Sequence, residues 1–407
     1  MVRVVWTRAA IPYLSKEHPH EPHPPLGPED VAAMRLRDAF LVGLMAGGAL
    51  GGCATAPQKP LGVPIDLHRL NQAHYVQVIY TQKQSAKVTY LKKLPSPGTA
   101  PAPMACRYAN TRHQRWNRGA WIWKTHALLG HPRFAAAFLD KAHRLGLDRL
   151  YLYLEGPLDI YRPLLHEAHA SGMRIYALTG DPSDVENPSV VYTTIDKVEG
   201  YNRSHQLGFS GIQFDIEPYA LSAFANHEQA IYERYVHLLR SIRSDIKGRL
   251  EWGVVVPFWF DQVQLHHESL IKLIMQQADN VAVMAYRTHY QNIVELANNS
   301  LCEGEALGKS VYLGIETSPI PDETHFILST QQVLHYISYY QGRPYLNHRI
   351  SSARPLIAHY TVSGSEISFY PDVEAAVRVT AKCPKYDSFA GWIINGLDEG
   401  WHVGKMH

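Results

Sequence analysis

The sequence predicts an α/β protein whose main domain is a (β/α)8 TIM barrel. Eight short β-rich runs alternate with amphipathic helical stretches over residues 118–407, and this count and span are typical of such a barrel. An open, doubly wound sheet also alternates strand and helix. However, no glycine-rich phosphate-binding turn follows the first run, as it does in dinucleotide-binding sheets of that kind. We therefore expect a closed barrel.

The predicted strands are short runs rich in β-branched and aromatic residues. Helices are expected between them, for example at 131–146 and at 227–246, and in the second of these stretches apolar residues recur at three and four positions. The seventh unit is long, and we expect an insertion there, with a helix around 329–341 and a hairpin at 355–370 over the barrel mouth. The eight runs lie at residues 119–124, 149–155, 173–180, 211–217, 251–259, 280–286, 310–316 and 389–396.

A segment typical of an export signal precedes the barrel. Residues 1–33 are rich in Pro and His, and no packed structure is expected there. Residues 34–52 show a basic start, an apolar stretch too short to span a membrane, and then small residues. The Leu-Gly-Gly-Cys sequence that ends at Cys53 resembles a bacterial lipobox. This resemblance implies Met34 as the true start, lipidation of Cys53, and attachment to the cell envelope, with Ala54 favouring the outer membrane.

Residues 53–117 are predicted to form a tether and a small N-terminal hairpin region. Two runs of alternating character lie within residues 65–94, and they suggest the two strands of the hairpin. Three cysteines follow the lipobox, at Cys106, Cys302 and Cys383. One pair could be bridged in an oxidising compartment, but spacing leaves the pairing open.

The composition excludes several classes of function. Hydrophobic residues make up 46% and charged residues 19%, which is a folding composition. With 39 basic and 37 acidic residues, the net charge of +2 argues against a nucleic-acid partner. Neither the spacing of a metal site nor a Gly-x-Ser-x-Gly nucleophile turn occurs. We expect no metal, no cofactor, and membrane contact through the lipid anchor alone.

The run at 211–217 places two carboxyl groups inside the predicted barrel. Side chains alternate along a strand, so Gln213, Asp215 and Glu217 share the inward face, while the apolar side chains between them face the helices. Buried carboxylates are costly unless they are paired, hydrogen-bonded or protonated. A core Arg or Lys would make them a structural ion pair. Without one, a carboxyl with a raised pKa beside an ionised neighbour is suited to general acid catalysis.

The same run resembles the fourth strand of family 18 glycoside hydrolases, the chitinases and their relatives. That strand reads Asp-Gly-x-Asp-x-Asp-x-Glu, and "SGIQFDIE" is similar to it. The resemblance implies that Glu217 is the proton donor. It also implies that Asp215 orients the substrate's N-acetyl group, which attacks the anomeric carbon. Gln213 and Ser210 stand where the family has aspartates.

Two further strands carry parts of the same resemblance. The sequence "VMAYR" at 283–287 is similar to the family's sixth strand, which implies that Tyr286 lies near the reacting sugar. The sequence "GWIING" at 391–396 resembles the eighth strand, which implies that Trp392 forms the floor of a sugar subsite.

Catalytic residues of barrel enzymes lie at the carboxyl ends of strands. Other side chains at these ends are therefore also candidates for catalysis or substrate binding. Glu316 ends the seventh run, so Glu217 as acid/base and Glu316 as nucleophile would form the carboxylate pair of a retaining glycosidase. Trp123 and Trp259 are candidate stacking surfaces for sugar rings. The polar candidates at or just after strand ends are Glu155, Asp181, Asp261 and Asp398, of which Glu155 and Asp398 are predicted to bind substrate.

The sequence thus predicts an envelope-anchored glycoside hydrolase that acts on a polysaccharide or oligosaccharide. A hypothesis from another class is a non-catalytic glycan-binding lipoprotein on the same scaffold, because Gln213 and Ser210 are the kind of change that loss of activity would leave. A third is an envelope assembly factor that docks through residues 65–94. Neither the glycan nor the oligomeric state follows from the sequence.

Overall fold

The computed structural model describes residues 63–81, 86–91, 116–126, 132–340, 343–346, 350 and 356–398. The expected signal peptide and Cys53 lie outside these ranges, so lipidation stays a prediction. Within them, no helix combines the length and apolar character needed to cross a membrane, and no cluster of His, Cys, Asp or Glu side chains is arranged to hold a metal ion.

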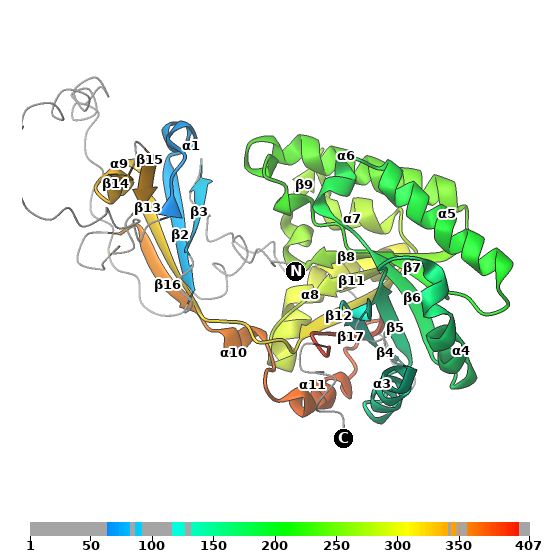
Figure 1. Ribbon diagram of the computed structural model, residues 1–407. Helices are drawn as coiled ribbons and strands as arrows, with labels where there is room; N and C mark the ends of the chain where they lie inside the picture. The colour runs from blue at the N-terminus through cyan, green and yellow to red at the C-terminus, as the bar shows by residue number, and fades with distance from the viewer. Residues whose placement is uncertain are drawn as a thin grey trace, which may run out of the picture.

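Eight parallel strands form a closed barrel, which confirms the predicted fold class (Figure 1). The last strand pairs with the first, from Gly391 beside Asn117 to Ile394 beside Ala120, and this pairing closes the barrel. Most strands end before the predicted residue, and the first begins at Asn117. In order, the strands are β4 (Asn117–Ile122), β5 (Arg149–Tyr153), β6 (Arg174–Thr179), β7 (Gly211–Phe214), β8 (Glu251–Pro257), β11 (Asn280–Met284), β12 (Ser310–Glu316) and β17 (Phe389–Asn395).

Helices surround the barrel on its outside (Figure 1). The two helices that the sequence predicted by range are α3 (Pro132–Arg144) and α6 (Phe224–Ile246). The others in the described part of the chain are α4 (Arg162–Ala170), α5 (Ser189–Ser204), α7 (Leu270–Met275), α8 (Tyr290–Leu307) and α11 (Val373–Thr380). Short 3₁₀ helices follow several strands at the carboxyl end: η2 (Leu158–Tyr161), η3 (Pro182–Val185), η4 (Pro218–Ala220) and η5 (Phe258–Gln262).

Two apolar layers fix which side chains point into the barrel. Ile212, Phe214 and Ile216 belong to the outer layer, between strands and helices. Trp121 belongs to the inner layer, and it contacts Gln213 from across the barrel. The predicted alternation along the fourth strand is therefore confirmed.

A second, smaller unit combines the N-terminal strands with the insertion between β12 and β17. Its four-stranded antiparallel sheet has the order β16-β13-β2-β3, built from β2 (Tyr75–Thr81), β3 (Ala86–Leu91), β13 (Glu323–Ser329) and β16 (Ala358–Val362). The hairpin of β2 and β3 thus pairs with the insertion rather than standing alone. A three-stranded sheet of β1 (Val63–Pro64), β15 (Arg343–Leu346) and β14 (Ile337–Tyr340), with helices α1 (Leu67–Gln72) and α9 (Thr330–Leu334), completes the unit.

The details predicted for the insertion were wrong. The helix expected around 329–341 ends at Leu334, and the chain then turns into β14. The hairpin expected at 355–370 is a single strand, β16, followed by the short helix α10 (Gly364–Ile367). The reason is that β16 pairs with β13, thirty or more residues earlier in the chain, and local sequence pattern does not reveal such a partner.

The cysteines are partly assigned. Cys302, on α8, is in a disulfide, and Cys383 is free.

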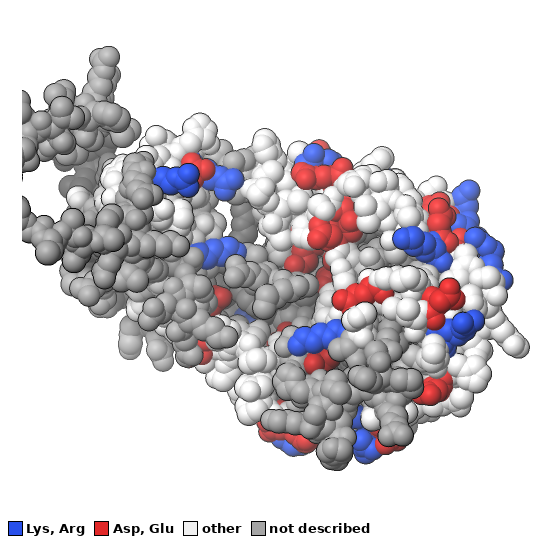
Figure 2. Space-filling model, viewed as in Figure 1, with Lys and Arg blue, Asp and Glu red and all other residues white. Residues whose placement is uncertain are grey.

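Charged side chains of both signs are scattered over the described surface in Figure 2, and no basic stripe crosses that face. This distribution agrees with the near-balanced net charge of +2.

Candidate active site

Asp215 and Glu217 lie just beyond the carboxyl end of β7. The strand ends at Phe214, three residues before the predicted end, although the Asp215 backbone N–H still donates to Thr179 O of β6 at 2.8 Å. Pro218 then starts η4, because a proline has no N–H to continue a ladder. Both carboxyl groups therefore sit at the barrel mouth.

A glycine at the end of β6 allows the backbone to approach Asp215. Gly180 has a φ of +150°, and a Cβ there would lie 2.2 Å from the Asp215 carbonyl oxygen. Any other residue at position 180 would displace the backbone that carries Asp215.

The two carboxyl groups are buried and have no counter-charge among the described residues. Asp215 is 7% exposed and Glu217 is 6% exposed. Burial, and then the charge of Glu217, raise the pKa of Asp215 well above its usual range. Burial also raises the pKa of Glu217, although a hydrogen bond from Tyr219 acts in the opposite direction. Both carboxyl groups therefore hold a proton to higher pH than an exposed aspartate or glutamate does.

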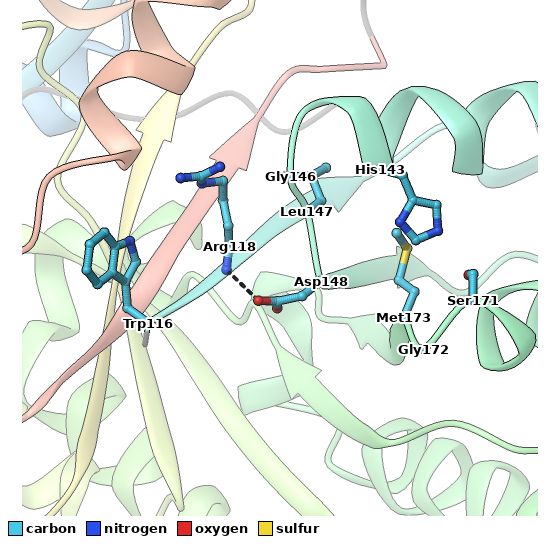
Figure 3. Close-up of a pocket in the computed structure, with 9 residues that line it drawn as sticks. All are labelled: Trp116, Arg118, His143, Gly146, Leu147, Asp148, Ser171, Gly172 and Met173. Atoms are coloured by element: carbon cyan, nitrogen blue, oxygen red, sulfur yellow. Dashed lines mark hydrogen bonds between the residues drawn. The ribbon is translucent and has the colours of Figure 1, made fainter. Parts of the chain in front are cut away.

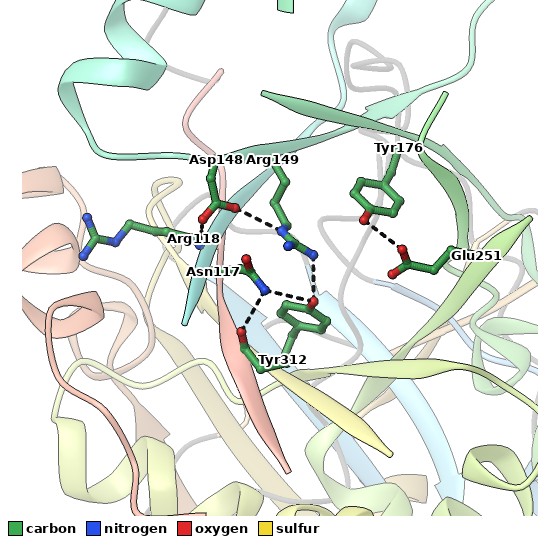
Figure 4. A network of polar contacts seen from close by, with 8 residues as sticks. Asn117, Arg118, Asp148, Arg149, Tyr176, Glu251 and Tyr312 are labelled. Atoms are coloured by element: carbon green, nitrogen blue, oxygen red, sulfur yellow. Dashed lines mark hydrogen bonds and ion pairs between the residues drawn. The ribbon is translucent and has the colours of Figure 1, made fainter. Parts of the chain in front are cut away.

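The core arginine that could have neutralised the pair lies elsewhere. Arg149 begins β5 at the amino end of the barrel, where its Nη1 donates to Tyr312 Oη at 2.7 Å and its Nε to Asp148 at 3.1 Å (Figure 4). In the same network Tyr176 donates to Glu251 at 3.1 Å. This network joins strands at the end of the barrel opposite the Asp215–Glu217 pair.

Tyr219 holds Glu217, and sequence analysis missed it. Its hydroxyl donates a short hydrogen bond to Glu217 Oε1. Its ring packs edge-on against Trp259 and Phe260, with centroid distances of 5.1 and 5.9 Å. Trp259 is only 8% exposed, so it supports Tyr219 more than it offers a stacking face. The signal in the sequence was the tyrosine two residues after the glutamate, behind Pro218.

Tyr286 lies among three carboxyl groups. It follows β11 and is 2% exposed. Burial first, and then the charges of Glu316, Asp215 and Glu217, raise its pKa well above the usual range. Its hydroxyl therefore remains protonated and can donate a hydrogen bond at the site. The structure brings together the tyrosine and the carboxylates that the sequence singled out.

Glu316 accepts four hydrogen bonds from its neighbours. Its Oε1 accepts from the backbone N–H groups of Thr317 and Ser318 at 2.8 and 2.7 Å, and from Ser318 Oγ at 2.6 Å. Its Oε2 accepts from Asn395 Nδ2 at 2.7 Å. Lone pairs engaged in this way are poorly placed for attack on a sugar. The arrangement instead fits a carboxylate that orients its neighbours.

Trp123 is the aromatic ring that Glu316 orients indirectly. Its indole N–H donates at 2.8 Å to Asn395 Oδ1, the other end of the amide that Glu316 holds. The half-buried ring is tilted against Tyr153 at 5.5 Å. Asp398 Oδ2 accepts from the Trp123 backbone N–H at 2.8 Å. Trp123 is thus fixed at both its backbone and its ring.

Glu155 and Asp398 act on the loop after β4 in the same manner. Glu155 Oε2 accepts from Thr125 Oγ1 at 2.9 Å and from the His126 N–H at 2.8 Å. Asp398 Oδ2 also accepts from the Lys124 N–H at 2.8 Å. Both carboxylates, predicted to bind substrate, are engaged in holding this loop.

The role expected for Trp392 was wrong. Its side chain is fully buried in the outer layer, where the indole N–H donates to Lys382 O at 2.9 Å and the ring packs against Phe389. Along β17, the side chains of Ala390, Ile393 and Asn395 point inward. Trp392 lies one position out of phase, so it faces the helices.

A tryptophan closes the barrel interior. Trp121, on β4, donates its indole N–H to Gln213 Oε1 at 2.6 Å. The far edge of its ring lies beside Gly314 of β12, where an added Cβ would be 2.8 Å from the ring. The ring therefore spans from β4 to both β7 and β12. It fills the barrel interior beside the inward side of β7, the side that also carries Asp215.

A separate cavity of about 490 Å³ lies at the amino end of the barrel (Figure 3). Its charged groups are engaged within the fold. The Arg118 guanidinium donates to Leu145 O and Thr380 O, both at 3.3 Å. Asp148 accepts from the Arg118 backbone N–H at 3.2 Å and from Arg149 Nε at 3.1 Å. It is remote from the strand-end carboxyl groups, so it is not the candidate active site.

The chain has a low similarity to several solved structures. A class V chitinase from Nicotiana tobaccum is 13% identical, with 72% of this chain and 97% of that chain covered and a TM-score of 0.40. The Bacillus cereus spore cortex-lytic enzyme SleL is 12% identical, with coverages of 69% and 70% and a TM-score of 0.39. An endo-β-N-acetylglucosaminidase from Cordyceps militaris, in apo form, is 9% identical, with coverages of 72% and 85% and a TM-score of 0.40. No protein-family model and no curated protein matches the sequence.

Proposed function

We propose that this protein is a glycoside hydrolase that uses Glu217 as its general acid/base. The observation that supports the proposal is the buried Asp215–Glu217 pair at the barrel mouth, which has no counter-cation among the described residues and whose pKa values are both raised. Protonation of a leaving glycosidic oxygen requires a carboxyl group that is still protonated near neutral pH.

The hydrogen bond from Tyr219 determines which oxygen can give up the proton. Because the tyrosine hydroxyl donates to Oε1 of Glu217, the transferable proton is on Oε2. In the first step this proton passes to the glycosidic oxygen as the bond to the anomeric carbon breaks. In the second step the Glu217 carboxylate takes a proton from the water that attacks the anomeric carbon.

The nucleophile we propose is the N-acetyl oxygen of the substrate. Glu316, the alternative, already accepts four hydrogen bonds from Thr317, Ser318 and Asn395. Asp215, on the same strand end as the acid, would orient the acetamido group and balance the positive charge that develops on it. The substrate class is therefore a glycan that contains N-acetylated amino sugars, with Trp123 as a stacking surface and Tyr286 as a hydrogen-bond donor.

The proposed location is the bacterial cell envelope, with the protein anchored through lipid on Cys53. This proposal is supported by the order of residues 34–53, a basic start, an apolar stretch, small residues and a cysteine. Cys53→Ser should leave the chain uncleaved or release it from the membrane fraction. Normal processing and membrane retention of that variant would contradict the anchor.

The experiment that tests the function is incubation of the purified protein with chitooligosaccharides, peptide-free peptidoglycan strands and a polymer without N-acetyl groups. New reducing ends, detected by mass spectrometry, are expected only from the N-acetylated glycans. Binding of a glycan with no new reducing ends in any sample would favour a non-catalytic glycan-binding protein. Cleavage of the polymer that lacks N-acetyl groups would contradict the proposed nucleophile.

A further inference from the structure

Two buried polar atoms without a described partner lie on neighbouring inward positions of the fourth barrel strand. They are Nε2 of Gln213, a donor, and Oδ1 of Asp215, an acceptor. Gln213 is 1% exposed. The Cα atoms of two residues that are neighbours on one face of an extended chain are about 6.6 Å apart. A glutamine side chain and an aspartate side chain can bridge this distance. A lone donor and a lone acceptor on two side chains placed in this way are complementary.

The orientation of the Gln213 amide is fixed by its other contact. An indole N–H can only donate, so the amide atom 2.6 Å from Trp121 Nε1 must be the oxygen. The NH₂ group is therefore the end that is left over. Trp121 cannot easily shift to release the amide, because its ring already lies against Gly314.

The two carboxyl groups differ in the donors that they have. Glu217 accepts from Tyr219, whereas Asp215 Oδ1 accepts from no described group. A donor stabilises the charged form of a carboxyl group, so these contacts alone favour a charged Glu217 and a protonated Asp215. General acid catalysis requires the reverse distribution, with the proton on Glu217.

We propose that Gln213 is a positioning residue: when Asp215 passes its proton to Glu217, the Nε2–H of Gln213 donates to Asp215 Oδ1 and holds the negative charge there. The O–H bond at Asp215 breaks and one forms at Glu217, so no further reactant is needed. An aspartate at position 213 could exchange a proton with Asp215, but an amide cannot. The inference deepens the proposed function and rests on it for its kinetic consequence.

The phenols that interact electrostatically with Asp215 do not titrate in the same pH range as a carboxyl group. Burial is the main cause that raises the pKa of each of the four tyrosines that interact electrostatically with Asp215, so these phenols stay neutral at working pH. Glu217 is then the group whose titration is linked to that of Asp215. The tyrosines are Tyr153 after β5, Tyr219 on η4, Tyr235 on α6 and Tyr286 after β11.

The test is a titration of Asp215 followed by carboxyl-selective ¹³C NMR, with Asp215→Asn to assign the resonance. Gln213→Met keeps a similar length but removes the donor. We expect the Asp215 midpoint to rise by about one to two pH units, the effect of losing one hydrogen bond to a charged group. An unchanged midpoint in Gln213→Met would overturn the proposal.

Gln77→Met is the matched control. Gln77 is also a buried glutamine, 1% exposed, but it lies on β2 of the smaller sheet, where it donates to Tyr360 at 3.1 Å. Its substitution also removes a buried hydrogen bond, yet it should leave the Asp215 midpoint unchanged. Equal shifts in both variants would indicate a general loss of stability and would also overturn the proposal.

A second readout needs no substitution at Gln213 and covers the case in which Gln213→Met does not fold. In protein labelled with side-chain ¹⁵N-glutamine, the Nε2 resonance of Gln213 should move with the Asp215 midpoint, and Asp215→Asn should abolish that movement. A resonance that does not move with pH would contradict the proposal. These titrations do not require hydrolysis, so inactivity of every variant would contradict only the proposed function.

Discussion

Tyr219 donates its hydroxyl hydrogen to Oε1 of Glu217, and both side chains are buried at the carboxyl end of the fourth barrel strand. The tyrosine comes two residues after the glutamate, on a 3₁₀ turn that Pro218 begins. Its ring is held by Trp259 and Phe260. The acid is therefore positioned by its own loop rather than by a distant strand.

Tyr219→Phe should shift the pH dependence of catalysis. The hydrogen bond from Tyr219 lowers the pKa of Glu217, so its removal raises that pKa and keeps the acid protonated to higher pH. The basic limb of the kcat profile should move upward by about one pH unit or more. Tyr235→Phe is the control, because the Tyr235 hydroxyl has no hydrogen-bond partner among the described residues. A downward shift for Tyr219→Phe would contradict the assigned contact.

Trp123 and Trp392 should have opposite effects when truncated. Trp123→Ala removes a half-buried ring at the mouth, and we expect KM to rise about tenfold with little change in stability. Trp392→Ala empties a site in the outer layer, and we expect a loss of about 3–5 kcal/mol in the free energy of unfolding with KM unchanged. Denaturant titration and steady-state kinetics on both variants check this. A raised KM for Trp392→Ala alone would restore the role that the sequence suggested.

Glu316→Gln distinguishes an orienting carboxylate from a nucleophile. In the glutamine an NH₂ group replaces one carboxylate oxygen and faces the donor groups of Ser318 or Asn395. The Asn395 amide would then no longer be held in position to accept from Trp123. We expect a lower melting temperature, a higher KM and a fall in kcat of less than about 100-fold. Complete loss of turnover in folded protein, with a trapped glycosyl–enzyme in the parent, would identify Glu316 as the nucleophile instead.

Asp261 should make stability depend on pH. It lies on η5 after β8, 8% exposed, and burial is the main cause that raises its pKa to about 7. The folded state binds the Asp261 proton more tightly than the unfolded state does. The stabilisation that this proton gives to the folded state is therefore complete at low pH and is lost as pH rises from about 4 to 7. Asp261→Asn should therefore gain up to about 4 kcal/mol relative to the parent at pH 8.

Chemical denaturation between pH 4 and pH 8 measures the effect of Asp261→Asn. The exposed Asp140, paired with Arg144 on α3, supplies the control variant Asp140→Asn, which should leave the pH dependence unchanged. An identical pH slope in the parent and in Asp261→Asn would show that this carboxyl group does not carry the effect.

Local sequence pattern was sufficient for the barrel and for the face of its fourth strand. The alternation of Gln213, Asp215 and Glu217 with apolar residues is a property of one strand, and the barrel interior conforms to it. The pairing and register between strands could not be predicted from the local sequence pattern. The phase of Trp392 depends on the pairing of β17, which shifts register beside Val311 and Tyr312.

The same limit applies to the insertion and to the contacts of Glu316. β13 pairs with β2, which lies at the other end of the chain, and nothing in either run specifies that partner. Glu316 ends its strand as expected, but its four hydrogen bonds come from a following turn and from Asn395 on another strand. A strand-end carboxylate looks the same in the sequence whether it attacks a sugar or anchors a loop.

The measurement that tests the central claim most directly is the turnover of an N-acetylated oligosaccharide by Glu217→Gln. Glu199→Gln is the matched control, because Glu199 is a buried glutamate, 7% exposed, that pairs with Arg249 away from the site. We predict that Glu217→Gln lowers kcat by roughly 100-fold or more with little change in substrate binding, while Glu199→Gln retains kcat in its folded fraction. Full activity of purified, folded Glu217→Gln would contradict the assignment of Glu217 as the acid.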